Sequence, residues 1–198
     1  SEWRAERRNN ARMLAQYGVL EGGEYAEIRA FLEGELDGLP ADVRNIHYVN
    51  FANQDVVAST DQDLQGSRLN ADDTPWSEQG VAYGDNGVFV SKPYVKDGAT
   101  HVAYVARIET ELGRRAAVVM TTSLTEVTEN FRKPTDGSFT QLVGGDGSVV
   151  ADDSEVATMQ PYVENESSSV VGATETGLVT AGSVAKSLQS DHVVAYAP

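Results

Sequence analysis

The chain has 198 residues, enough for one ordinary domain or two small ones, and its acidic residues outnumber its basic ones by 30 to 15. The resulting formal charge of −15 repels nucleic acid and anionic membrane surfaces, so proteins that read phosphate backbones are excluded first. Cysteine is absent, which excludes disulfides, thiolate nucleophiles and cysteine-ligated zinc. No apolar run of 18 residues occurs, so no segment of the sequence predicts a transmembrane helix.

The composition is typical of adaptation to molar salt. Only four of the 15 basic residues are lysines, and Asp and Glu are spread along the whole chain rather than gathered in a tail. In molar salt the Debye length falls to about 3 Å, so repulsion among surface carboxylates is largely screened. We therefore expect a halophilic source, with an ordinary acidic protein that folds without salt as the alternative.

The first 38 residues predict helix. Apolar side chains recur at helical spacing from Trp3 through Leu14 to Leu36. Gly22-Gly23 predicts a kink or break, and Gly38-Leu39-Pro40 predicts the end of the helical segment. The sequence thus indicates a long N-terminal helix with one interruption.

From Val43 onward the apolar residues recur with a period of two, which is typical of β-strands. A turn over 53–55 joins the first two strands into a hairpin, and a long polar segment over 61–87 follows. A loop of this length in a compact domain is usually functional or disordered. Three more strands are predicted over 88–91, 102–108 and 116–121. Ser123-x-x-Glu126 then reads as a capping box that opens a helix.

The pattern then begins again with a second hairpin over 139–151. Val149-Val150-Ala151 repeats Val56-Val57-Ala58, and Val194-Ala195-Tyr196 repeats Val102-Ala103-Tyr104 at nearly the same offset. Two matches at one offset indicate a duplicated β-module. The second copy stops before the last strand and helix of the first, so we expect it to be incomplete and the native protein to continue.

The order of these segments resembles that of a double Cache (PDC-type) sensor domain, over nearly the whole chain. The resemblance rests on the hairpin over 48–59, on Pro75-Trp76 in the long loop, and on the segments over 90–94, 102–108, 117–124 and 142–151. It implies an α+β fold in which a stalk helix carries two modules with antiparallel sheets. The implied parts are the stalk over 1–42, a membrane-distal module over 43–134 and a smaller, incomplete membrane-proximal module over 135–198.

Together with the acidic composition, the resemblance implies the extracellular sensor domain of a haloarchaeal chemotaxis transducer in the plasma membrane. Such a domain is not an enzyme and needs no cofactor. It binds a small molecule in the distal module and passes a conformational signal through the membrane. Transmembrane helices would lie outside this fragment, and the family also implies a homodimer formed through the N-terminal helix.

Family members that bind amino acids carry an Arg two residues before the loop Trp, a Tyr-x-Asp after the next strand, and an Asp at the end of the last sheet strand. Trp76 and Tyr94 match this pattern. Thr74, Lys96 and Thr121 stand where the family has Arg, Asp and Asp. The groups that hold the ammonium and carboxylate are missing, so we expect a ligand other than an ordinary amino acid.

The candidate ligand-binding residues are aromatic or cationic, with one strand-end hydroxyl, and they are Trp76, Tyr83, Tyr94, Lys96, Tyr104, Arg107 and Thr121. Aromatic walls and charge-assisted hydrogen bonds suit a small anionic or neutral ligand, for example a carboxylate. Arg68 is a further candidate partner for an anion. The alternative for the aromatic residues is a structural role in the core, which the strand pattern favours for Tyr104.

Other functions have weaker support. The three histidines show no metal-ligand spacing, and Asp61-x-Asp63 lacks the Gly and Glu of a calcium loop, so we expect no metal. No Gly-x-Ser-x-Gly motif is present, which leaves a halophilic hydrolase as a remote alternative. The sensor of a histidine kinase, a domain without a pocket that docks a binding protein, and a structural surface module remain open.

Overall fold

The structure is a computed structural model that describes residues 2–70, 72–79, 87–108, 116–124, 141–143, 149–152, 177–182 and 191–196. The chain divides into two compact units. The first unit comprises Ser1–Tyr94 and His101–Ser123, and the second comprises Val95–Thr100 and Leu124–Pro198. Within the described ranges, no helix is long and apolar enough to cross a membrane.

Three helices make up the N-terminal segment: α1 (Glu2–Leu14), α2 (Gly18–Gly22) and α3 (Tyr25–Leu36). The predicted break at Gly22-Gly23 is confirmed, but the single long helix is wrong because α1 already ends at Leu14. Tyr17 is extended, with φ −74° and ψ 127°, and its ring packs on Phe31 of α3 at 4.8 Å between centroids. The apolar periodicity runs on through this junction and therefore hides the first break.

The expected antiparallel sheet is present and has six strands: β1 (Val43–Asn50), β2 (Asp55–Ser59), β3 (Val88–Val90), β4 (Tyr94–Lys96), β5 (Ala99–Ile108) and β6 (Ala116–Ser123). Their order is β2-β1-β6-β5-β3, and β4 also pairs with β5. The predicted strands between 43 and 121 are confirmed, and β4 is an addition. It leads into a turn in which Asp97 and Gly98 both have positive φ, 52° and 76°.

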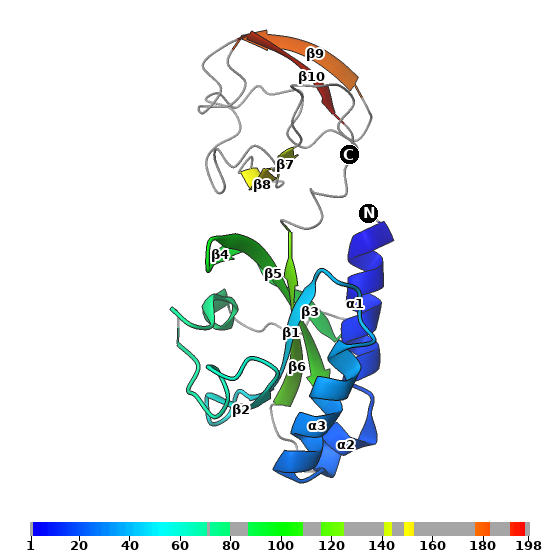
Figure 1. Cartoon of the computed structure of the whole chain (residues 1–198), viewed down its shortest axis with the longest axis vertical. Coiled ribbons are helices and arrows are strands. Elements are labelled where there is room, and N and C mark those ends of the chain that lie inside the picture. Colours follow the sequence, from blue (N-terminus) through cyan, green and yellow to red (C-terminus); the bar gives the residue numbers. More distant parts are fainter. Residues whose placement is uncertain are drawn as a thin grey trace. The chain divides into compact units, whose positions relative to one another are not determined.

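The two faces of this sheet are covered by different parts of the chain (Figure 1). The helices lie against one face, and the described part of the segment between β2 and β3, with the 3₁₀ helix η1 (Pro75–Gln79), lies against the other. All eight residues of β6 are consequently buried. We call the two sides the helix face and the loop face. The side chains of β6 alternate between them, so that the loop face receives Ala117, Val119, Thr121 and Ser123.

The described strands of the second unit form two separate antiparallel ladders. These are β7 (Gln141–Val143) with β8 (Val149–Asp152), and β9 (Gly177–Gly182) with β10 (Asp191–Tyr196). The first ladder confirms the predicted second hairpin. The repeated motifs lie on β8 and β10, as their counterparts lie on β2 and β5. The duplication itself stays a prediction, and the helix predicted after Ser123 and the boundary at 134 lie outside the described residues.

A buried ion pair fixes α1 to the sheet. The carboxylate of Asp42, just before β1, accepts hydrogen bonds from Arg7 Nε at 2.8 Å and Arg7 Nη2 at 2.6 Å. Trp3 Nε1 donates to the same carboxylate at 3.2 Å. Burial by itself lowers the pKa of Arg7, but the hydrogen bonds to Asp42 and its charge outweigh this and leave the pKa raised. The helix and the sheet are therefore joined at one charged residue.

We expect Asp42→Ala to lower the free energy of unfolding by about 3–5 kcal/mol, because it removes both hydrogen bonds to the buried guanidinium of Arg7 and leaves it with the exposed carboxylate of Glu6, 3.1 Å away. Urea unfolding in molar KCl, followed by circular dichroism, measures this. Glu33→Ala is the matched control, since Glu33 pairs with Arg29 at the exposed surface and its loss should leave the midpoint unchanged. Equal midpoints for the two variants would show that the buried pair adds nothing net to stability.

Candidate functional site

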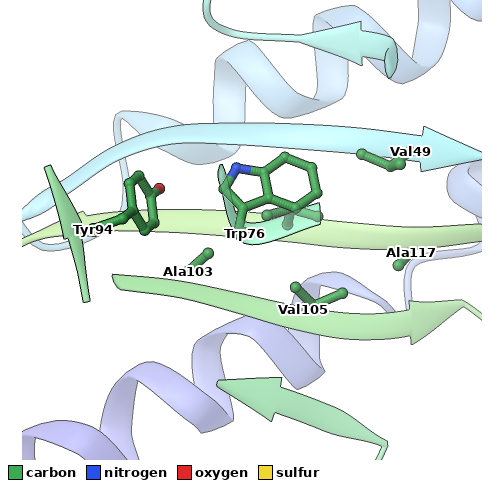
Figure 2. Packing of buried hydrophobic residues seen from close by; sticks show 7 residues of the cluster. Val49, Trp76, Tyr94, Ala103, Val105 and Ala117 are labelled. Carbon is green, nitrogen blue, oxygen red and sulfur yellow. The ribbon is translucent and has the colours of Figure 1, made fainter. Parts of the chain in front are cut away.

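Trp76 is the centre of the apolar cluster on the loop face. It comes from η1 and is only 1% exposed. Figure 2 shows its indole between Tyr94 and Val49, close to Ala103 on the sheet. The buried members of the cluster come from η1 and from four strands: Val49, Trp76, Tyr94, Ala103, Val105, Ala117 and Val119. Trp76 thus anchors the long segment between β2 and β3 to the sheet.

Thr74 shapes the turn that presents Trp76. Its hydroxyl donates to the carbonyl of Asn70 at 2.7 Å and accepts from the Asn70 N–H at 3.0 Å. Its carbonyl accepts from the N–H of Ser77 at 2.9 Å, and the residue is fully buried. In this chain, position 74 therefore holds the loop together through local hydrogen bonds.

Buried polar side chains lie next to the tryptophan. His47 of β1 is 2% exposed, and its ring stacks on Trp76 at 6.0 Å between centroids. Its Nδ1 lies 2.8 Å from the hydroxyl of Ser59, which also accepts from the N–H of Asp61 at 2.9 Å. On the neighbouring strand, Thr121 donates to the carbonyl of Asn45 at 3.3 Å. Polar and aromatic groups therefore share this part of the loop face.

Tyr94 closes the same region from the start of β4. Its ring stacks on His101 of β5 at 5.8 Å, and burial raises the pKa of its phenol, so the group stays neutral and keeps its proton for donation. Among the described residues, the buried charged side chains are Arg7 and Asp42, which pair with each other beside the helices. The buried polar groups of the loop face carry no formal charge when its histidines are neutral.

Three of the predicted site residues lie on the loop face: Trp76 and Tyr94 belong to one buried cluster, and Thr121 pairs with Ala103 of that cluster. The sequence pattern did not single out His47 or Ser123 beside them. The run of hydroxyl residues at the end of β6 was the available signal for Ser123. Strand alternation alone cannot show which of those hydroxyls faces the loop, because it does not say which face the loop covers.

The other predicted residues are placed elsewhere. Tyr104 lies on the helix face, where its ring lies 6.5 Å from that of Trp3 between centroids, and burial raises the pKa of its phenol.

Arg107 is exposed and lies four residues from Ala103 along β5, a distance of about 13 Å. Lys96 belongs to the second unit, and Tyr83 lies outside the described residues. The further candidate Arg68 is exposed beside Asp55, at 3.8 Å. The structure thus does not bring these residues together with Trp76.

No family model matches the sequence. Two relatives are transducer proteins of Halobacterium salinarum. BasT is 30% identical over 163 residues, which cover 82% of this chain and 20% of BasT. Htr18 is 27% identical over 180 residues, which cover 90% of this chain and 21% of Htr18. The chain spans about a fifth of the length of these relatives.

Solved structures with the same fold include ligand-binding domains of two Pseudomonas aeruginosa amino acid chemoreceptors. The PctC domain, in complex with GABA, has a TM-score of 0.66 and 15% identity, and the match covers 98% of this chain and 83% of that one. The PctB domain, in complex with L-Arg, has a TM-score of 0.64 and 16% identity, with coverages of 100% and 81%. At these identities the likeness concerns the fold alone.

This chain is a homologue of haloarchaeal transducers, and its fold is that of a chemoreceptor ligand-binding domain. The resemblance to Cache-type sensor domains is confirmed at this level. The source of the relatives also agrees with a composition adapted to molar salt.

We expect Trp76→Ala to lower the free energy of unfolding by about 3–5 kcal/mol, because it empties the centre of a packed cluster. Urea unfolding in molar KCl measures the loss. Tyr25→Ala removes an aromatic ring that is 45% exposed at the start of α3, and it should change stability far less. If both variants unfold at the same urea concentration, Trp76 does not anchor the loop.

Proposed function

We propose that this chain is the extracellular ligand-sensing domain of a chemotaxis transducer, and that it binds a small molecule on the loop face of the first unit. The observation that carries the proposal is that aromatic and polar side chains lie next to one another on that face. The buried rings of Trp76 and Tyr94 adjoin buried, uncharged polar side chains. Small-molecule sites are typically lined by aromatic residues with a few placed polar groups, whereas a purely structural core favours apolar side chains.

The comparisons support a sensor more than a catalyst. The relatives are named as transducers, and the solved neighbours are chemoreceptor domains that hold amino acids. This favours a transducer over a histidine kinase or a hydrolase. We therefore propose a domain without catalytic activity in which residues 135–198 form the membrane-proximal module. The membrane-spanning and signalling segments of the protein would lie outside this chain.

The proposed ligand is neutral or a small anion, such as a carboxylate. In this chain Thr74 is occupied by local hydrogen bonds, and Thr121 contributes a hydroxyl where amino-acid-binding members have a carboxylate. A buried ammonium would therefore lack a counter-charge among the described residues of the loop face. Arg107 extends from the same face of β5 and is exposed, but it lies four residues along the strand from Ala103, so it stays a predicted cation whose part in binding the screen below tests. Lys96 stays a predicted second cation.

We propose that the signal leaves the site through Asp42. The N–H of Ser123, at the end of β6, donates to the Asp42 carbonyl at 2.7 Å. The carboxylate of the same residue holds Arg7 and Trp3 of α1. A ligand that moves the end of β6 thus acts on the helix through one residue. It can shift the balance between two arrangements only by the difference in its affinity for them.

A thermal-shift screen in molar KCl tests the sensing role, with organic acids, amino acids, sugars and nucleosides as probes. A compound present at 100 times its Kd should add about 2.7 kcal/mol of stability, because it binds only the folded state. Lys96→Ala/Arg107→Ala should weaken the binding of an acidic hit, and Arg12→Ala/Arg29→Ala is the charge-matched control on the helices. If no probe stabilises the chain, the result counts against a small-molecule site. If an acidic compound binds the Lys96→Ala/Arg107→Ala variant as tightly as the parent chain, neither cation belongs to the binding site.

The route through Asp42 has its own readout, because the chain contains only two tryptophans and Trp76→Phe leaves Trp3 as the sole emitter. We expect a saturating hit from the screen to change the emission of Trp3 in this variant. Adding Asp42→Asn should abolish the change while the hit still raises the melting temperature. An unchanged Trp3 emission in the Trp76→Phe variant, with the hit bound, would contradict the proposed route.

A further inference from the structure

The hydroxyl of Ser123 is buried on the loop face and has no hydrogen-bond partner among the described residues. Ser123 is 1% exposed, and within the described part of the chain its Oγ has no hydrogen-bond partner. Its backbone N–H is engaged in the fold and donates to the Asp42 carbonyl at 2.7 Å. A buried hydroxyl without a partner costs free energy, because it has given up its bonds to water. Such a group calls for an explanation in terms of function.

The surroundings of this hydroxyl belong to the proposed site. Ser123 lies opposite His101 in the register of β5 and β6, and the ring of His101 stacks on Tyr94. Thr121 precedes it by two residues and so faces the same side of the sheet. The Thr121 hydroxyl donates its hydrogen bond to the Asn45 carbonyl, so its oxygen can still accept one from a ligand. Donor and acceptor groups therefore stand together at the end of β6, and neither hydroxyl is charged.

We propose that Ser123 is a ligand-binding residue and that, with Thr121, it receives an uncharged oxygen-bearing group of the ligand, a hydroxyl or a carbonyl. The inference rests on the proposed function and deepens it. A serine hydroxyl both donates and accepts, so it complements a hydroxyl or carbonyl oxygen fully. An ammonium at the same place would be buried beside neutral oxygens without a counter-charge. The site thus selects for a hydroxyl-bearing compound over its amino counterpart.

Matched pairs of compounds test this selection. The pairs are L-lactate with L-alanine, glycerate with L-serine, and 4-hydroxybutyrate with GABA, and the members of each pair differ by a hydroxyl in place of an ammonium. Thermal shift and calorimetry on the chain in molar KCl give the affinities. We expect the hydroxyl member of at least one pair to bind at least tenfold more tightly than its amino partner.

Two variants on neighbouring positions separate binding from folding. Ser123→Ala should leave the melting temperature unchanged or slightly raised, because the lost hydroxyl made no hydrogen bond, and should weaken the preferred hydroxyl compound about 2- to 10-fold. Thr122→Val is the control, since Thr122 points to the helix face and donates to the Val102 carbonyl at 3.1 Å. It should lower the melting temperature by about 2–4 °C and leave the affinity unchanged.

The outcomes distinguish the inference from the proposed function. Preference for the amino members, or an affinity that Ser123→Ala leaves unchanged, overturns the role of Ser123 and retains a sensor that binds a small molecule. A fall in melting temperature for Ser123→Ala as large as that for Thr122→Val also overturns the inference, because it shows a structural hydrogen bond. Failure of every pair and of the wider screen to bind overturns both.

Discussion

The burial of β6 on both faces is the constraint on which the rest of the first unit depends. A strand at the centre of an antiparallel sheet often keeps one face in water, but here all eight side chains are excluded from it. Each face must therefore be covered by a separate part of the chain. The helices cover one face and are tied down by Arg7 and Asp42. The long segment after β2 covers the other and is tied down by Trp76.

The helices and the loop segment differ in chemistry, and our proposal assigns signalling to the first and ligand binding to the second. On the helix side, Nε and Nη2 of Arg7 both donate to the carboxylate of Asp42, the bidentate geometry that a buried pair needs if it is not to cost stability. On the loop side, hydroxyl and imidazole groups are arranged around aromatic rings. A charged anchor suits a fixed joint between elements. Hydroxyl groups suit a surface that binds a ligand of similar polarity, and one of them, the Ser123 hydroxyl, has no hydrogen-bond partner among the described residues.

Asp42 is the point at which these two sides meet. Its backbone carbonyl accepts a hydrogen bond from Ser123 at the end of β6, and its carboxylate accepts a hydrogen bond from Trp3 of α1. Because both contacts are made by one residue, the proposed route couples a displacement at Ser123 to a displacement at Arg7 directly. The short path needs no chain of intermediate side chains, and it places the reporter ring of Trp3 next to the joint.

Local patterns predicted much of the architecture. The change of period at Val43, the turn before Asp55 and the strands up to Thr121 could be predicted because each depends on neighbours within a few residues. The end of α1 at Leu14 could not be predicted in this way. It depends on the ring of Tyr17 meeting Phe31, and the apolar spacing continues through the junction as if the helix did.

The class of protein could be read from the amino-acid order alone, because the acidic, cysteine-free composition, the order of the strands and the resemblance to sensor domains need no knowledge of the folded chain. Which residues share a site became clear from the folded chain. Alternation along β5 places Tyr104 and Ala103 on opposite faces of the sheet, but the sequence of the strand does not show which of the two faces the loop covers. The loop covers the face of Ala103 because Trp76 packs there, and the helices take the face of Tyr104 because Arg7 reaches Asp42. Both contacts join residues far apart in the chain, and no local pattern encodes them.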